Sequence, residues 1–166
     1  PRLRRFQTRY PHTTLHLAAQ MEPFVLAESG FDAAIHFEHP AWVGMQTYPL
    51  FEEVLVPVCH PSLLGKGPTD RPLNVLPLLH RRQNPNAWQR YAQETGIHLS
   101  NPAAGSRFDL HAMLIEATLA GLGVALVPRL YVEPELEQGR LVAPWPEGKT
   151  IAKTFCLVLP EPIELS

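Results

Sequence analysis

Cysteine is scarce in this sequence of 166 residues, which has only Cys59 and Cys156, without CxxC spacing. A disulfide-rich scaffold is therefore excluded, and two buried thiols in a reducing, cytoplasmic setting are expected. No apolar run approaches the roughly 20 residues that a membrane-spanning helix needs. The opening residues also lack the charged and then apolar pattern of a secretory leader. The sequence therefore predicts a cytoplasmic protein.

Clustered positive charge is also missing. Lys and Arg number 14 against 16 Asp and Glu, for a net charge of -2. Binding to nucleic acid phosphates needs concentrated Lys and Arg, so this composition argues against DNA binding by these residues themselves. The one concentration, four arginines between residues 2 and 9, has the spacing of a polar helix face opposite Leu3 and Phe6. We expect that face to be solvated.

Catalytic motifs are absent as well. The sequence contains no GxSxG, no HExxH and no phosphate-binding P-loop. Gly121 and Gly123 precede an apolar strand, whereas the glycines of a dinucleotide-binding fingerprint follow one. We therefore predict that the chain is not an enzyme and has no cofactor, although an enzyme built on the same scaffold stays an open alternative.

Apolar residues make up 45% of the chain and charged residues 18%, as in globular proteins. Helical and strand periodicities alternate along it, which favours the α/β class. The clearest helix is 109–122, for which Asp109 is the expected N-cap and which leads through glycines into a buried strand at 124–127. Further helices are expected at 2–10, 23–28, 86–94 and 131–137, and further strands at 13–18, 31–37, 45–59, 76–80, 103–107, 140–142 and 154–159.

The segment from Ala117 to Arg129, ATLAGLGVALVPR, resembles the most recognisable stretch of the effector-binding domain of LysR-type transcriptional regulators. Other matches stand in register with it over nearly the whole chain. They are Tyr10-Pro11, Asp32-Ala33-Ala34-Ile35, Trp42-Val43-Gly44, Val56-Pro57-Val58-Cys59-His60-Pro61 and Gly139-Arg140-Leu141-Val142. The Trp-x-Gly and Pro-Val-Cys elements are most similar to the subgroup of the glycine-cleavage activator.

The resemblance implies a two-lobed clamshell like the periplasmic binding proteins of type 2, with mixed, mainly parallel sheets. It places residues 1–57 and 129–166 in lobe I and residues 58–128 in lobe II. The hinge between the lobes would then contain Val56, Pro57, Val58, Val127 and Pro128.

The resemblance also implies a function. A small metabolite, such as an amino acid or a carboxylate, would bind between the lobes of a homodimer or homotetramer and change DNA binding by an N-terminal helix-turn-helix. We expect this chain to be truncated at both ends, without that DNA-binding part and without the first strand of lobe I. An apolar groove or an unpaired sheet edge, to which another chain can bind, should result beside strand 32–37. The alternative is a free-standing solute-binding protein of a transport system.

Ligands of such a clamshell sit at the carboxyl ends of parallel strands and at helix N-termini. The candidate ligand-binding residues at such places are His36, Glu38, His80, Arg107, Phe108 and Asp109. His36, Glu38 and His39 raise the alternative of a metal site, because imidazole and carboxylate groups bind Zn²⁺. On a strand His39 points away from the other two, so no metal is expected. Cys59 is expected to be a structural thiol.

Overall fold

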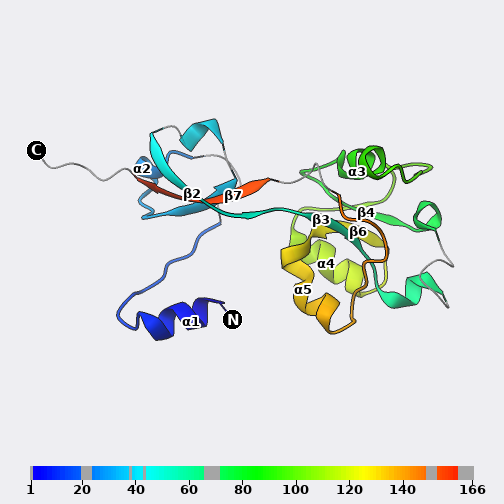
Figure 1. Ribbon diagram of the computed structural model, residues 1–166, viewed down its shortest axis with the longest axis horizontal. Coiled ribbons are helices and arrows are strands. Elements are labelled where there is room, and N and C mark those ends of the chain that lie inside the picture. The colour runs from blue at the N-terminus through cyan, green and yellow to red at the C-terminus, as the bar shows by residue number, and fades with distance from the viewer. Residues whose placement is uncertain are drawn as a thin grey trace, which may run out of the picture.

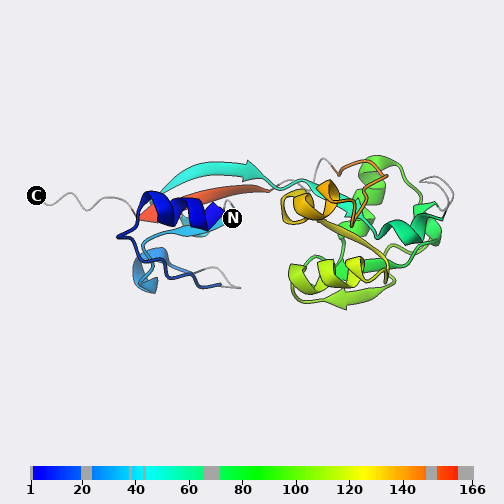
Figure 2. The same cartoon turned by 90° about the horizontal axis from the view of Figure 1, so that it is seen from below.

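The computed structural model describes residues 2–19, 24–37, 39–42, 44–65, 72–148 and 153–160. Two separate sheets lie at opposite ends of an elongated molecule, and two stretches of chain connect them (Figures 1 and 2). The molecule is therefore two-lobed, as expected. We call the lobe of the three-stranded sheet lobe I and the lobe of the four-stranded sheet lobe II.

Lobe I has strand order β1-β7-β2, and both strand pairs are antiparallel. Its small core consists of Leu26, Trp42, Cys156 and Val158. The first helix, α1, exposes Leu3, Phe6 and Tyr10 instead of burying them. The elements of this lobe are α1 (Arg2–Arg9), α2 (Leu26–Ser29), β1 (Ala34–Phe37), the 3-10 turn η1 (Pro40–Trp42), β2 (Met45–Glu52) and β7 (Thr154–Pro160).

Lobe II has strand order β3-β6-β4-β5, in which β3 and β6 are antiparallel while β4 runs parallel to both β5 and β6. Its strands are β3 (Leu55–Val58), β4 (Leu78–Arg81), β5 (Ser106–Phe108) and β6 (Val124–Pro128). Its helices are α3 (Ala87–Thr95), α4 (His111–Leu119) and α5 (Arg129–Glu137), with 3-10 turns η2 (Pro61–Leu64) and η3 (Leu73–Val75).

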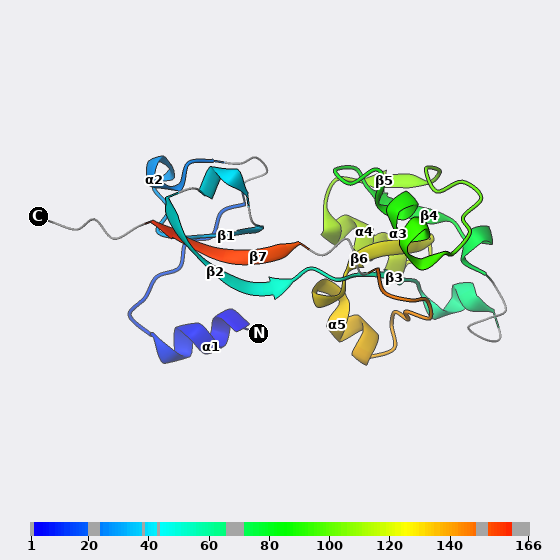
Figure 3. The same ribbon diagram turned by 45° about the horizontal axis from the view of Figure 1, so that its top comes forward.

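The sheet of lobe II is buried on both faces because its strands are apolar at successive positions. Every residue of β3 and β6 is buried. Since neighbouring side chains of a strand point to opposite faces, Val124 and Leu126 pack against α3, whereas Ala125 and Val127 pack against α4 and α5. Helices therefore cover both faces of this sheet (Figure 3), the arrangement that continuous apolar strands predict.

Two glycines permit close backbone contacts in lobe II. A Cβ atom at Gly123 would lie 2.4 Å from the carbonyl oxygen of Pro77, and one at Gly105 would lie 1.9 Å from that of Leu78. Both distances are far shorter than van der Waals contact. Glycine is thus required where the turn before β6 and the loop before β5 pass the beginning of β4.

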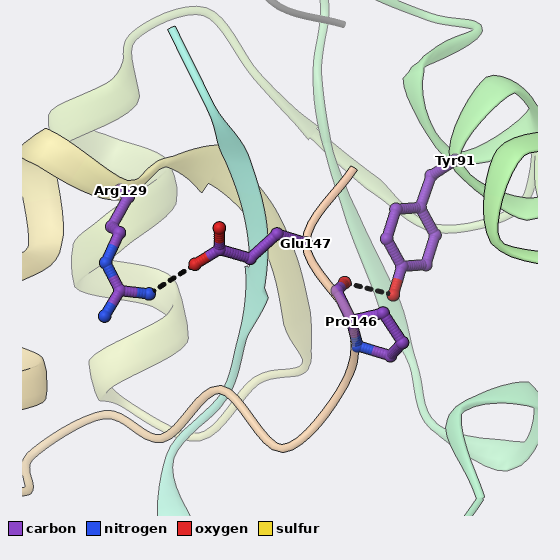
Figure 4. A network of polar contacts seen from close by, with 4 residues as sticks. All are labelled: Tyr91, Arg129, Pro146 and Glu147. Atoms are coloured by element: carbon purple, nitrogen blue, oxygen red, sulfur yellow. Dashed lines mark hydrogen bonds and ion pairs between the residues drawn. The ribbon is translucent and has the colours of Figure 1, made fainter. Parts of the chain in front are cut away.

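Residues 141–148, here called the strap, run along the outer edge of β3. Val142 exchanges backbone hydrogen bonds with Cys59, and the amide of Gly148 donates to the carbonyl of Leu55 at 3.0 Å. Two side chains hold the strap from either side (Figure 4). The Tyr91 hydroxyl donates to the Pro146 carbonyl at 2.8 Å, and Arg129 pairs with Glu147 at 2.6 Å.

The division between the lobes differs from the expected one, which assigned residues 129–166 to lobe I. Helix α5 and the strap pack on the sheet of lobe II, where Val132 and Leu141 are fully buried. The reason is that Pro128 does not end the lobe: it precedes α5, which turns its apolar side back onto the sheet.

The expected hinge residues also lie elsewhere. Val56 pairs with Val127, Pro57 with Leu126, and Val58 with Ala125, all inside the sheet of lobe II. The chain leaves lobe I at residues 53–54, between β2 and β3, and Lys153 directly precedes β7 of lobe I.

Several local expectations were wrong in detail. Residues 13–18 form no strand, because no described strand lies beside them to supply hydrogen bonds. Residues 140–142 contribute one bridge instead of a strand. The N-cap of α4 is Leu110 and not Asp109. Three of the five adjacent strand pairs among the described residues are antiparallel, so parallel pairing is less prevalent than expected.

The expected unpaired edge in lobe I is present. Within the described chain β1 pairs only with β7, and its other side has no neighbouring strand. Ile35 on this strand is 64% exposed. Both cysteines are buried free thiols, as expected.

Candidate functional site

A pocket of about 130 Å³ lies where lobe II meets the two crossing segments, and we call it the junction pocket. It is at the carboxyl end of β4, and its lining includes Ala87 and His111, the first residues of α3 and α4. Its lining residues are Glu53, Leu55, Leu79, His80, Arg81, Gln83, Asn84, Ala87, Trp88, His111, Leu126 and Lys153.

His80 is the buried polar side chain of this pocket, with 2% of its surface exposed. Its Nε2 lies 2.8 Å from the carbonyl oxygen of Ala104. A carbonyl only accepts hydrogen bonds, so Nε2 carries the hydrogen, and Nδ1 of the neutral ring is an acceptor. Nδ1 has no partner. His80, which lines the pocket, therefore has an unused acceptor.

Arg81 is the next residue on β4 and supplies the opposite chemistry. Its Nη2 donates to Gln83, while its buried Nη1 has no partner. Among the described residues, this atom and His80 Nδ1 are the only buried side-chain polar atoms without a hydrogen bond. Burial lowers the pKa of Arg81, against the opposing effects of Asp109 and Tyr131. A partly desolvated guanidinium with an unused N–H favours an anionic partner.

The crossing segments contribute one carboxylate and one ammonium. The amide of Glu53 donates to the Lys153 carbonyl at 2.7 Å, which holds the two segments together. Burial raises the pKa of the Glu53 carboxyl, and the charge of Lys153 only partly opposes this. The Lys153 ammonium lies 4.3 Å from the centroid of the Phe37 ring in lobe I. Charged groups therefore lie where these two segments meet.

His111, at the beginning of α4, forms another wall. Burial and, secondarily, the charge of Arg81 lower its pKa to about 4, so the ring is neutral near pH 7. Its ring centroid lies 5.2 Å from that of Tyr131, whose pKa is raised by burial and by Glu53. Tyr131 and Glu53 also line a neighbouring, largely apolar pocket of about 230 Å³.

Trp88 fixes the apolar side of the junction pocket. It is 1% exposed, and its indole nitrogen donates to the Leu79 carbonyl at 2.9 Å. The pocket thus combines an apolar wall with convergent polar groups, as ligand sites do. In the described ranges no cluster of three or more His, Cys, Asp or Glu could hold a metal ion. The arrangement is suited to binding a small polar molecule.

Of the five candidate residues that the structure describes, His80 alone lines this pocket. Arg107 is exposed and donates to the Ala103 carbonyl. Phe108 packs into the core on the α4 side of the sheet. Asp109 forms an exposed ion pair with Arg82 at 2.8 Å.

His36 belongs to lobe I and lies on β1 against Trp42, with 5.4 Å between the ring centroids. It does not line the junction pocket. Glu38 lies outside the described residues.

Sequence reasoning missed Glu53, Arg81, His111 and Lys153, which line the pocket together with His80. Arg81 had a usable signal, since it follows His80 at the end of a buried strand and precedes a helix. Glu53 and Lys153 had none, because their proximity depends on two crossing segments that are 100 positions apart in the chain.

Comparison with known families identifies the fold and its lineage. Residues 1–166 match the family described as the LysR substrate binding domain. The chain belongs to this family. The LysR substrate-binding domain described here is 36% identical over 151 residues to the HTH-type transcriptional regulator TrpI of Pseudomonas aeruginosa, covering 87% of this chain and 51% of that protein.

A second relative is the glycine cleavage system transcriptional activator of Escherichia coli, 32% identical over 161 residues, which covers 95% of this chain and 52% of the activator. The LysR substrate-binding domain thus spans about half the length of these curated relatives. The subgroup expected from the sequence is therefore represented among its relatives.

Solved structures agree with this assignment. The effector domain of the transcriptional regulator AmpR of Pseudomonas aeruginosa matches with a TM-score of 0.75 and 29% identity, covering 97% of this chain and 77% of that one. CrgA of Neisseria meningitidis, a LysR-type regulator, matches with a TM-score of 0.78, covering 96% of this chain and 55% of that one. At 17% identity the CrgA match shows the shared fold alone. No helix in the described part of this LysR substrate-binding domain is long and apolar enough to cross a membrane.

Proposed function

We propose that this chain is the effector-sensing part of a LysR-type transcriptional regulator and that a small metabolite binds in the junction pocket. Binding would change the arrangement of the two lobes and so modulate DNA contacts made by a helix-turn-helix elsewhere in the protein. The chain binds its ligand without transforming it, and it acts in the cytoplasm.

One observation carries this proposal: the junction pocket includes side chains from lobe II and from both segments that cross to lobe I. His80, Arg81 and His111 belong to lobe II, whereas Glu53 and Lys153 belong to the crossings. A ligand that contacts both sets binds one lobe arrangement better than others. Differential affinity of this kind is what a population shift requires.

The assembled protein is proposed to be a homodimer or homotetramer. Helix α1 supports this, because Leu3, Phe6 and Tyr10 are 52%, 40% and 47% exposed. An apolar helix face in water is a surface that a second subunit can cover. DNA would be bound only through the helix-turn-helix part.

The alternative of a solute-binding protein for transport has no support from the relatives described above, which are transcriptional regulators. An enzyme on this scaffold would need reacting groups in the pocket. The polar groups that line the junction pocket are accounted for by the binding of a small polar molecule.

The proposal is tested by thermal unfolding with a panel of free amino acids and short mono- and dicarboxylates. A ligand that binds only the folded chain raises the free energy of unfolding, by about 2.7 kcal/mol at a ligand concentration of 100 times Kd. The melting temperature rises as a result. We expect at least one panel member to raise it, and Arg81→Gln to abolish the rise. The matched control Arg82→Gln should keep it, because Arg82 lies outside the pocket and pairs with Asp109. If no member of the panel raises the melting temperature, the proposal of effector binding is contradicted.

A further inference from the structure

We propose that the ligand of the junction pocket is a small free α-amino acid bound as a zwitterion, with its carboxylate at Arg81 and its ammonium between His80 Nδ1 and Glu53. This inference rests on the proposed function, since it specifies the chemical class that the effector site accepts. It follows from the pocket's size, from its unused hydrogen-bonding atoms and from the placement of its charges.

The size of the pocket favours a small ligand. Its volume is about 130 Å³, and one water-sized group needs roughly 10–15 Å³ of such space. The pocket therefore holds on the order of ten non-hydrogen atoms. Free amino acids with short side chains fit this limit, whereas nucleotides, sugar phosphates and peptides exceed it.

The unused atoms require a ligand with both an acceptor and a donor. Arg81 Nη1 is a donor without a partner, and His80 Nδ1 is an acceptor without a partner, because Nε2 of the same ring is committed to Ala104. Leaving a buried polar atom without a hydrogen bond costs about 1–3 kcal/mol. A ligand that forms a hydrogen bond with such an atom therefore binds more tightly. A simple carboxylate satisfies Arg81 alone, and a simple amine satisfies His80 alone.

Glu53 distinguishes an ammonium donor from a hydroxyl donor. Its carboxylate lines the same pocket as His80. The ammonium of Lys153, whose charge acts on the Glu53 carboxyl, lies over the Phe37 ring of lobe I. A partly buried carboxylate is stabilised by a cation in contact with it. An α-amino acid thus gains charge pairing at both of its groups, whereas a 2-hydroxy acid gains it only at Arg81.

The test is isothermal titration calorimetry of the unmodified chain with glycine, L-alanine, L-serine, L-threonine and L-valine. Each amino acid that binds is compared with its des-amino acid, its 2-hydroxy acid and its carboxamide. Hydrogen bonds to charged groups contribute about 1.5–3 kcal/mol, which corresponds to about 10- to 100-fold in affinity. We expect at least one amino acid to bind and each of its three analogues to bind at least tenfold more weakly.

Two substitutions assign the groups. Glu53→Gln should reduce amino acid affinity by at least tenfold while affecting the des-amino acid little, and Arg81→Gln should weaken both. The neighbouring changes Glu52→Gln and Arg82→Gln are matched controls, because both side chains are exposed and lie outside the junction pocket. Melting curves of all four variants establish that they are folded.

The outcomes separate this inference from the proposed function. If des-amino or 2-hydroxy acids bind as tightly as amino acids, the zwitterion assignment is overturned while effector binding stands. The same holds if only dicarboxylates bind. If neither this series nor the wider carboxylate panel binds, both the assignment and the proposed function fail.

Discussion

His80 and Arg81 are consecutive residues with complementary unused atoms at the end of β4. Adjacent side chains of a strand point to opposite faces in its interior. At the end of a strand both can reach the same space, and both line the junction pocket. The sequence signal for two such pocket residues is a buried strand that ends in two polar residues before a helix.

His111 leads to a prediction about pH. Its pKa is about 4 in the folded chain, against 6.5 for an ordinary histidine. As the pH falls from about 6.5 to about 4, the unfolded chain therefore binds a proton that the folded chain does not, and stability is lost across this window. Above the window both states are neutral and His111 contributes no pH dependence. We expect His111→Gln to lose less stability than the unmodified chain on acidification, measured by urea unfolding at each pH.

His12→Gln is the matched control for this measurement, because His12 is exposed and does not line the pocket. A difference curve for His111→Gln that matches the curve of this control would mean that the His111 ring is not desolvated in the folded chain.

At the scale of elements, the strap depends on one buried hydroxyl. Tyr91 is fully buried, and its hydroxyl donates to the Pro146 carbonyl at 2.8 Å. Burial raises its pKa to about 12, so the donor stays protonated. Tyr91→Phe leaves that carbonyl without this donor and should lower the free energy of unfolding by about 1–2 kcal/mol. Urea unfolding measures the loss, and hydrogen exchange should show faster exchange at the amides of Val142 and Gly148.

Tyr48→Phe serves as the control, because Tyr48 is exposed and its hydroxyl binds only Gln46. We expect it to change stability by less than about 0.5 kcal/mol, as surface substitutions generally do. Equal losses in the two variants would show that the buried hydrogen bond adds nothing specific.

Elements with strong local signals were predictable from the sequence. The buried strand β6 and helices α1, α3 and α5 lie within a few residues of their expected positions, because periodicity and Gly or Pro boundaries are local properties. The prediction of a strand at 13–18 was wrong, because a strand needs a neighbouring strand to bond with. No local sequence pattern shows whether such a neighbour is present. The lobe boundary failed for a similar reason: only the tertiary contacts of Val132 and Leu141 assign 129–148 to lobe II.

The candidate site was less predictable than the fold. His80 could be inferred from its place at the end of a strand, whereas Arg107 and Asp109, chosen by the same rule, face solvent. β5 is an edge strand, so its end lies to one side of the pocket. Glu53 and Lys153 depend on how two crossing segments meet, which the periodicity of either segment does not encode.

Considered as a whole molecule, the two lobes have very different cores. Among the described residues, lobe I has one cluster of four buried residues, whereas lobe II has clusters of twelve and nine. Hydrophobic stabilisation scales with the apolar area buried. Lobe I should therefore open at a smaller free energy than lobe II.

Native-state hydrogen exchange at increasing denaturant concentration tests this difference. Amides of β1 and β7 should exchange through openings of lower free energy than amides of β6 and β4. Ligand bound in the junction pocket should reduce the difference in opening free energy between the lobes, because the ligand contacts the crossing segments as well as lobe II. Equal opening free energies in β7 and β6 would instead show that the lobes unfold as a single unit.

The backbone hydrogen bond between Gly148 and Leu55 has a consequence for how such a gene can be divided. The segment 54–148 begins and ends at one place, and Glu53 and Lys153, which flank it, are themselves joined by a hydrogen bond of 2.7 Å. In the order of the chain, lobe II is thus one continuous segment inserted between two neighbouring strands of lobe I, β2 and β7. A recombination event with both breakpoints at these positions would exchange most of the pocket while leaving the rest of the chain intact, so related proteins could acquire a new ligand in one step.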